Sequence, residues 1–259
     1  MNERRLSFGR LLLKTHELYW DHFLTFVGLL AIPHLPAALP FLIPEPLRRS
    51  GGEVGLALLG LAWGLVYLVA WTALIWAIGA AMRGEEVAVT SALAHVPLRV
   101  LGRLVWTYLL ATCLFALMAI AAMILFGLIG AFTRTVTPLV TLLIMAILGA
   151  TVWWFIRLLF LPQVVVLEEF GGWAAVARSG ELVKGRWLRV FLVWLLFTVL
   201  EAAVTWALSH LPVLRYLAGL LVAPIGAIWV TLLYYERVDA RLLLPASALR
   251  TRGVTPRLG

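Results

Sequence analysis

Residues 109–129 read LLATCLFALMAIAAMILFGLI and contain no charged side chain. A helix needs about 20 consecutive apolar residues to cross about 30 Å of hydrocarbon. The strands of a membrane β-barrel alternate between apolar and polar residues, and this run does not alternate. The stretch therefore predicts a transmembrane α-helix.

The composition of the whole chain agrees with this stretch. Its 259 residues are 63% hydrophobic and 13% charged, with a mean hydropathy of +0.99. Ordinary globular domains are about half apolar and about a quarter charged. So much apolar surface excludes a soluble enzyme, a disordered chain and a nucleic-acid module. We interpret the net charge of +8 as the excess of Lys and Arg in cytoplasmic loops, so no nucleic-acid partner is expected.

Five further stretches are long and apolar enough to span a bilayer. We expect an all-α polytopic protein with one six-span membrane domain over 1–245 and a basic cytoplasmic tail over 246–259. The first span contains Pro33, Pro36 and Pro40, so we expect its outer half to be bent, or irregular and buried. The six predicted spans are about 22–42, 55–82, 104–130, 136–161, 188–208 and 213–235.

The Lys and Arg residues are distributed unevenly between the two sides of the predicted membrane. Sixteen lie on one side of the membrane and four on the other, while Arg157 lies inside the fourth span. Positive charge collects on the cytoplasmic side. We therefore predict that both termini are cytoplasmic.

Two interior segments, Gly84–Trp106 and Leu167–Val190, resemble each other at a spacing of 83 residues. We expect each to be an amphipathic interfacial helix followed by a two-span hairpin, with the N-terminal segment as a third copy. This gives two or three interfacial helices and parallel repeats. The alternative is that any basic loop entering a span looks similar. The residues that match are Glu85 with Glu168, Glu86 with Glu169, Ala92 with Ala175, Gly102 with Gly185 and Arg103 with Arg186.

Two details of these interfacial helices can be predicted. We expect the acidic pairs to open the helices, where negative charge suits the positive end of the helix dipole. In the later copy we expect one apolar stripe, made by Trp173, Val176, Ala177 and Gly180.

Glu201 is an ionisable residue about thirteen positions into the fifth span, and such a residue is a functional-site hypothesis. It shares a helical face with Thr198, Thr205 and Ser209. The seam predicts either a proton- or solute-linked site or a hydrogen-bonded contact between helices. For Arg157 we expect a structural or headgroup-contacting role, because its side chain can reach the interface.

Catalytic motifs are missing from the sequence. It contains no Gly-rich phosphate loop, HExxH motif or nucleophile elbow. The five histidines show no metal-ligand spacing with acids or with Cys113. We therefore expect no catalytic residue, no cofactor and no metal, and we predict that the protein is not an enzyme.

The run Arg157–Arg189 contains Arg-x-x-x-x-Pro, VVVLEE and a Gly-Gly pair, and the last span ends LLYYERVDAR at Arg241. These motifs resemble the bacterial glycerophosphoryl diester phosphodiesterase membrane-domain family, which includes uncharacterised inner-membrane proteins of the YciC type. The resemblance covers the second half well and the first half only in layout. It implies a six-span membrane fold. It implies no activity, because the His-Arg-Gly type of signature expected of the catalytic domain is missing.

The leading hypothesis is a non-catalytic membrane protein that binds lipids, including anionic ones, or organises partners at the cytoplasmic face. The alternative is a small-solute or proton-linked transporter or channel that uses Glu201 and the seam of Thr198, Thr205 and Ser209. A homo- or hetero-oligomer in the membrane is compatible with either. The predicted contact surface consists of Glu168, Arg178, Glu181, Lys184, Arg186 and Arg189.

Overall fold

The computed structural model describes residues 8–42, 52–132, 137–208 and 212–238, and every regular element in these ranges is helical. The all-α prediction is therefore confirmed. The chain divides into two compact units, one of residues 1–97 and 196–259 and the other of residues 98–195. One membrane domain over 1–245 stays a prediction.

Five helical stretches in the described part of the chain are long and apolar enough to cross a membrane, so the protein belongs to the multi-pass membrane class. The helix of the first predicted span offers a shorter apolar stretch, Phe23–His34, among the described residues. A sixth span therefore stays a prediction. The five stretches are Leu58–Met82, Leu98–Ile124, Thr141–Leu167, Trp187–Ala207 and Gly219–Val238.

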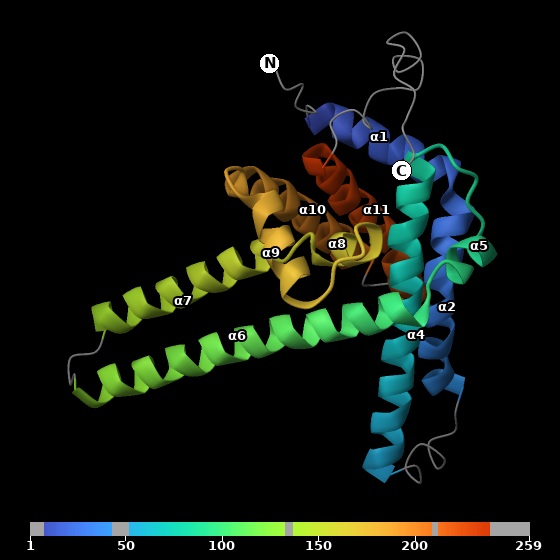
Figure 1. Ribbon diagram of the computed structural model, residues 1–259. Coiled ribbons are helices and arrows are strands. Elements are labelled where there is room, and N and C mark those ends of the chain that lie inside the picture. The colour runs from blue at the N-terminus through green and yellow to red at the C-terminus, as the bar shows by residue number, and fades with distance from the viewer. Residues whose placement is uncertain (1–7, 43–51, 133–136, 209–211, 239–259) are drawn as a thin grey trace, which may run out of the picture. The chain divides into compact units, whose positions relative to one another are not determined.

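The first unit is built around a core of packed helices. Helices α2 and α4 lie side by side, and α11 packs against α1, α2 and α4 (Figure 1). Small residues of α4, such as Ala73 and Ala77, are fully buried and let the backbones approach closely. The helices of this unit are α1 (Phe8–Asp21), α2 (Phe23–Leu42), α4 (Gly52–Met82), α5 (Val89–Ala94) and α11 (Pro212–Val238).

Helix α2 continues through Pro33, Pro36 and Pro40 as far as Leu42, so the alternative of an irregular outer half is wrong. The alternative of a bent outer half stays a prediction. A proline removes one backbone donor, but neighbouring helices can satisfy carbonyl groups inside a membrane bundle. A side-chain hydrogen bond also joins α2 to α4, because the indole Nε1 of Trp63 donates to the carbonyl oxygen of Pro33 at 2.6 Å.

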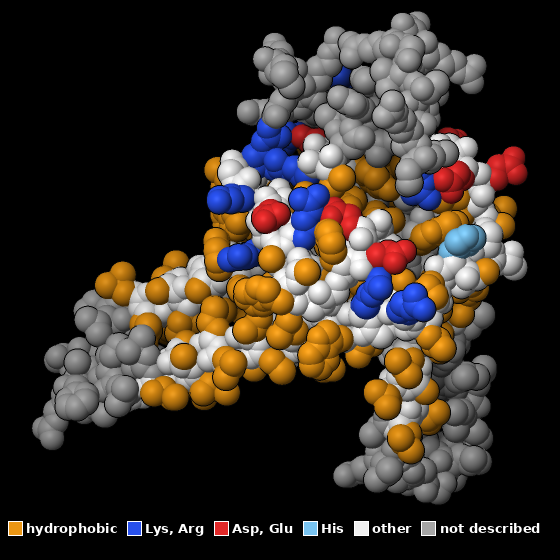
Figure 2. Space-filling view, in the orientation of Figure 1, with side chains coloured by type: hydrophobic (Ala, Val, Ile, Leu, Met, Phe, Trp, Pro, Cys, Tyr) orange, Lys and Arg blue, Asp and Glu red, His pale blue; other side chains and the backbone are white. Residues whose placement is uncertain are grey.

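The second unit contains two long helices and two short ones. Helices α6 (Leu98–Phe132) and α7 (Thr137–Arg157) lie side by side, and α9 (Gly172–Val183) packs against α6, α7 and α8 (Leu161–Leu167). Hydrophobic side chains cover α6 and α7, while charged side chains gather over α9 (Figure 2). Helix α10 (Trp187–Leu208) begins in this unit and ends in the other.

Two boundaries in the second unit differ from the predicted spans. Helix α6 begins at Leu98 rather than near 104, so its basic first turns belong to the long helix. Helix α7 ends at Arg157 rather than near 161. Pro162 lies in the first turn of α8 and cannot continue the preceding helix, which explains the early end.

The repeated segments start their helices at the same spacing. Helices α5 and α9 begin at Val89 and Gly172, each after an extended residue, and these positions are 83 residues apart. The likeness then ends, because α5 has 6 residues and α9 has 12.

Of the two detailed expectations for the later copy, the apolar stripe is not confirmed and the position of the acidic pair is wrong. Trp173 is 63% exposed, and α9 buries a different face because it packs against α6, α7 and α8. Glu168 and Glu169 precede α9 and do not lie in its first turn, because arginine side chains bind them instead. The buried side chains of α9 are Ala175, Val176, Ser179, Leu182 and Val183.

Candidate functional site

The candidate site lies where α7 ends against α9. The hydroxyl of the buried Ser179 donates to the carbonyl oxygen of Arg157 at 2.8 Å. A helix leaves its last carbonyl groups without intrahelical partners, and this bond satisfies one of them. The polar Ser179 can therefore lie on the buried face of α9, and the contact fixes α9 against the end of α7.

Arg157 directs its guanidinium group onto α9. Its Cζ atom lies 5.2 Å from the ring centroid of Trp153, one turn earlier on α7, which is cation–π geometry. A Cβ atom at Gly180 would lie 2.5 Å from Nε of Arg157 and 3.2 Å from Cζ. The missing side chain at Gly180 thus makes room for the guanidinium group.

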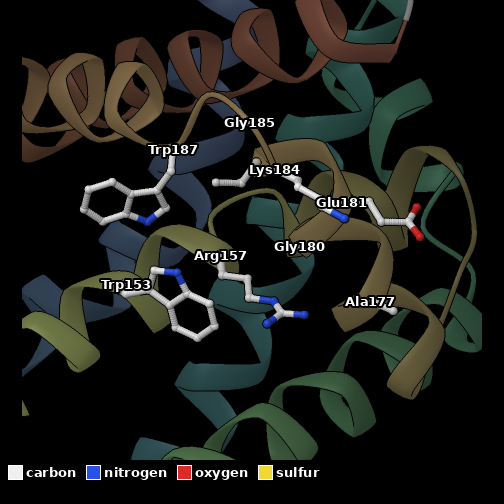
Figure 3. Close-up of a pocket in the computed structure, with 9 residues that line it drawn as sticks. Trp153, Arg157, Ala177, Gly180, Glu181, Lys184, Gly185 and Trp187 are labelled. Carbon is white, nitrogen blue, oxygen red and sulfur yellow. The ribbon is translucent and has the colours of Figure 1, made fainter.

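A pocket of about 500 Å³ opens around Arg157 (Figure 3). The Nε atom of Arg157 and the indole Nε1 of Trp187 are both buried and have no hydrogen-bond partner among the described residues. The residues that line the pocket therefore include buried hydrogen-bond donors that no described residue satisfies. Its lining consists of Trp153, Arg157, Ala177, Gly180, Glu181, Val183, Lys184, Gly185 and Trp187.

Arg178 lies beside the pocket and is held by two carboxylates. Its Nε donates to Oε2 of Glu168 at 2.9 Å, and its Nη1 lies 3.7 Å from Oε2 of Glu181. The Glu168 side chain is only 15% exposed, so this pair is shielded from water more than an ordinary surface pair. The charge of Arg178 is largely compensated, whereas Lys184 is exposed and forms no ion pair within the described ranges.

The beginning of α9 is fixed to α6. Nη1 of Arg103 donates to the carbonyl oxygen of Glu169 at 2.8 Å and to its carboxylate at 3.2 Å. The backbone N–H of Gly172 donates to the hydroxyl of the fully buried Thr107 at 2.7 Å. With the Ser179 contact, these bonds hold both ends of α9, so the pocket is formed by fixed helices.

The structure brings together some of the residues that the sequence singled out. Arg157, Glu181 and Lys184 line the pocket, while Arg186 and Arg189 flank its Trp187 at the start of α10. Sequence reasoning missed two parts of the site, Trp153 and the space above Gly180. The spacing of four residues between Trp153 and Arg157 on one helix was the available signal for the first.

Glu201 lies in the other unit, on the partly buried face of α10 with Thr198 and Thr205. Ser209, the last member of the predicted seam, lies outside the described residues. The transport role of this seam stays a prediction.

Comparison with known proteins places the chain in a family. No curated protein and no solved structure matches it. A family described as a domain of unknown function, DUF8558, matches residues 59–240, a range that contains every residue of the pocket. Because this match covers more than half of the sequence, the chain belongs to the DUF8558 family.

Proposed function

We propose that this protein is a non-catalytic multi-pass protein of the bacterial cytoplasmic membrane that binds lipids, including anionic ones, at its cytoplasmic face. The observation that supports this most directly is the pocket around Arg157. Cationic and donor groups converge there at the ends of two membrane-spanning helices, because Arg157 ends α7 and Trp187 begins α10.

The lengths of α7 and α10 support a position of the pocket at the depth of the lipid headgroups. Helix α7 has 21 residues and α10 has 22, and about 20 are enough to cross the hydrocarbon. Residues at the ends of such helices lie near the membrane–water interface, where Trp is enriched. We therefore place Arg157, Lys184 and Trp187 at the depth of lipid headgroups, with the membrane span ending at the end of α7.

Charge supports an anionic lipid. Each Lys or Arg near an anionic membrane surface contributes about 1 kcal/mol of attraction. Lys184, Arg186 and Arg189 lie at the junction of α9 and α10. We assign Arg178 to holding α9 in place, because two carboxylates already bind it.

The topology is part of this proposal. With α2 as the first of six spans, both termini and the pocket lie on the cytoplasmic side, where most Lys and Arg residues fall. Helices α1, α5 and α9 are then the interfacial helices. The resemblance to the glycerophosphoryl diester phosphodiesterase membrane-domain family supports the same arrangement of six spans. It implies no catalytic activity.

The proposal is tested with the full-length protein in detergent, by measuring retained phosphatidylglycerol with native mass spectrometry. We expect the triple variant Lys184→Gln, Arg186→Gln, Arg189→Gln to bind about tenfold or more weakly at low salt. The difference should shrink at high salt, because salt screens exposed charges.

The matched control is the charge-conserving variant Lys184→Arg, Arg186→Lys, Arg189→Lys. It should bind nearly as the natural chain does, because the attraction depends mainly on charge. Equal phosphatidylglycerol binding by the neutral triple variant and the natural chain at low salt would contradict the proposal.

A further inference from the structure

We infer that the pocket around Arg157 is a site for one phosphate-ester headgroup, and that Arg157 is its phosphate-binding residue. This inference rests on the proposed function and goes beyond it, since it names the chemical group and the residue that recognises it. A general attraction between basic residues and the membrane would need neither.

The unsatisfied groups in the pocket are all donors. Nε of Arg157 and Nε1 of Trp187 are buried without partners among the described residues. A guanidinium group and an indole can only donate, so neither can satisfy the other. The complementary ligand carries several acceptor oxygens and no donor at that end, which describes a phosphate ester.

The charge of the lining selects an anion. Arg157 and Lys184 contribute positive charge, and Glu181 is the one acid in the lining. The Glu181 carboxylate lies 3.7 Å from Arg178, which compensates part of its charge. The remaining field is positive, and arginine matches phosphate geometry with paired N–H groups.

The size of the pocket favours a headgroup over a free ion. About 500 Å³ lies within the usual range for small-molecule sites and exceeds what one inorganic ion fills. Trp153 adds aromatic surface beside the guanidinium group, and Trp187 adds aromatic surface elsewhere in the same lining (Figure 3). Such surface suits the glycerol and upper acyl part of a phospholipid, whose phosphate lies at this depth.

Gly180 is a positioning residue for Arg157. A Cβ atom at this position would lie 2.5 Å from Nε, so a methyl group must displace the guanidinium group. The displaced atoms belong to the flexible end of a side chain, so the fold tolerates the change. Gly180→Ala therefore moves the phosphate-binding group without removing its charge.

The experiment measures binding of four probes to the full-length protein in detergent, by native mass spectrometry at physiological salt. The probes are phosphatidylglycerol, oleate as an anionic lipid without phosphate, dioleoylglycerol as a neutral lipid, and soluble glycerol 3-phosphate. We expect saturable binding of one phosphatidylglycerol and much weaker binding of oleate and dioleoylglycerol.

Three variants test the residues. Arg157→Lys keeps the charge but loses the paired N–H geometry, and we expect roughly tenfold weaker phosphatidylglycerol binding. Gly180→Ala should weaken binding in the same direction. Gly102→Ala is the matched control, because Gly102 is a helical glycine of the same unit with open space around it, and it should bind as the natural chain does.

The outcomes separate this inference from the proposed function. Unchanged phosphatidylglycerol binding by both Arg157→Lys and Gly180→Ala overturns the inference, and it leaves the proposed function intact if the neutral triple variant still loses binding. Oleate binding that depends equally on Arg157 also overturns it, because the site then recognises any anion. Glycerol 3-phosphate binding as tightly as the lipid keeps the phosphate assignment and changes its source to a soluble ester.

Discussion

Two segments that share a sequence pattern, 84–97 and 167–186, have become different structures. Each contains an acidic pair, and each starts a helix at the same spacing of 83 residues. The first forms the 6-residue α5 and packs against the core of its unit. The second forms the 12-residue α9 and encloses a pocket. The shared sequence pattern therefore defines where a helix starts, but not how long the helix is or what it packs against.

One position that differs between the two segments contributes to this divergence. Pro97 in the first segment lies 83 residues before Gly180 in the second. A proline disfavours helical backbone in the residue before it, and α5 ends at Ala94. Glycine permits α9 to continue to Val183 and leaves room for Arg157. At the same spacing, the counterpart of Arg157 is Leu74, a fully buried core residue of α4.

The largest expected effect comes from copying that proline into the second segment. Gly180→Pro places proline inside α9, which costs about 3 kcal/mol or more and should also abolish phosphatidylglycerol binding. Thermal unfolding in detergent and native mass spectrometry measure the two effects. The reverse change, Pro97→Gly, is the control and should cost less than about 1 kcal/mol, because it lies outside α5. Equal destabilisation by both changes would contradict our account of the divergence.

Much of the fold follows from apolar runs alone. Helices α10 and α11 begin at Trp187 and Pro212, one residue from the predicted starts of 188 and 213. The end of α7 was harder to predict, because the apolar sequence LLFL continues after Arg157. The hydropathy of the sequence therefore does not fall where the helix ends. Pro162 was the signal for it.

The candidate site was harder to predict from the sequence than the fold. A pocket depends on which face of α9 meets α7, and tertiary contacts decide that. The buried position of Ser179 contradicts a purely apolar stripe, because its hydroxyl finds the carbonyl oxygen of Arg157. The acidic pair was misplaced for a similar reason, since its partners are Arg103, far along the chain, and Arg178, beyond the first turn of α9.

An effect of intermediate size is expected when the threonine that hydrogen-bonds to each of the two segments is replaced by valine. Thr107 accepts a bond from the backbone N–H of Gly172, whereas Thr25 donates to the carbonyl oxygen of Val87 at 3.0 Å. Thr107→Val should reduce the free energy of unfolding by about 1–3 kcal/mol, because it leaves a buried donor unsatisfied. Thr25→Val should cost about 1 kcal/mol or less, since a carbonyl oxygen has other acceptor capacity. Chemical denaturation of both variants measures the difference, and a larger loss for Thr25→Val would reverse our ranking.

The smallest expected effect concerns the acidic pair of the first segment. Arg83 donates to Glu85 at 2.6 Å, and this hydrogen bond holds the pKa of the Glu85 carboxyl below its ordinary value. A carboxyl whose pKa is lowered by folding stabilises the folded state above the ordinary glutamate pKa of about 4.3, and this stabilisation is lost as the pH falls through the lowered value. Because the Glu85 side chain is 48% exposed, we expect only a few tenths of a kcal/mol.

Glu85→Gln should therefore make the unfolding temperature slightly less sensitive to pH between about pH 6 and about pH 3.5. The matching variant in the second segment is Glu168→Gln. Glu168 pairs with Arg178, and its side chain is less exposed than that of Glu85. This change should cost more at neutral pH than Glu85→Gln, about 1 kcal/mol, since the surrounding protein shields that pair from water. If the two glutamine variants lose equal stability at neutral pH, the second segment gains nothing from shielding its ion pair. The contacts that hold α9 in place would then be those of Arg103, Thr107 and Ser179.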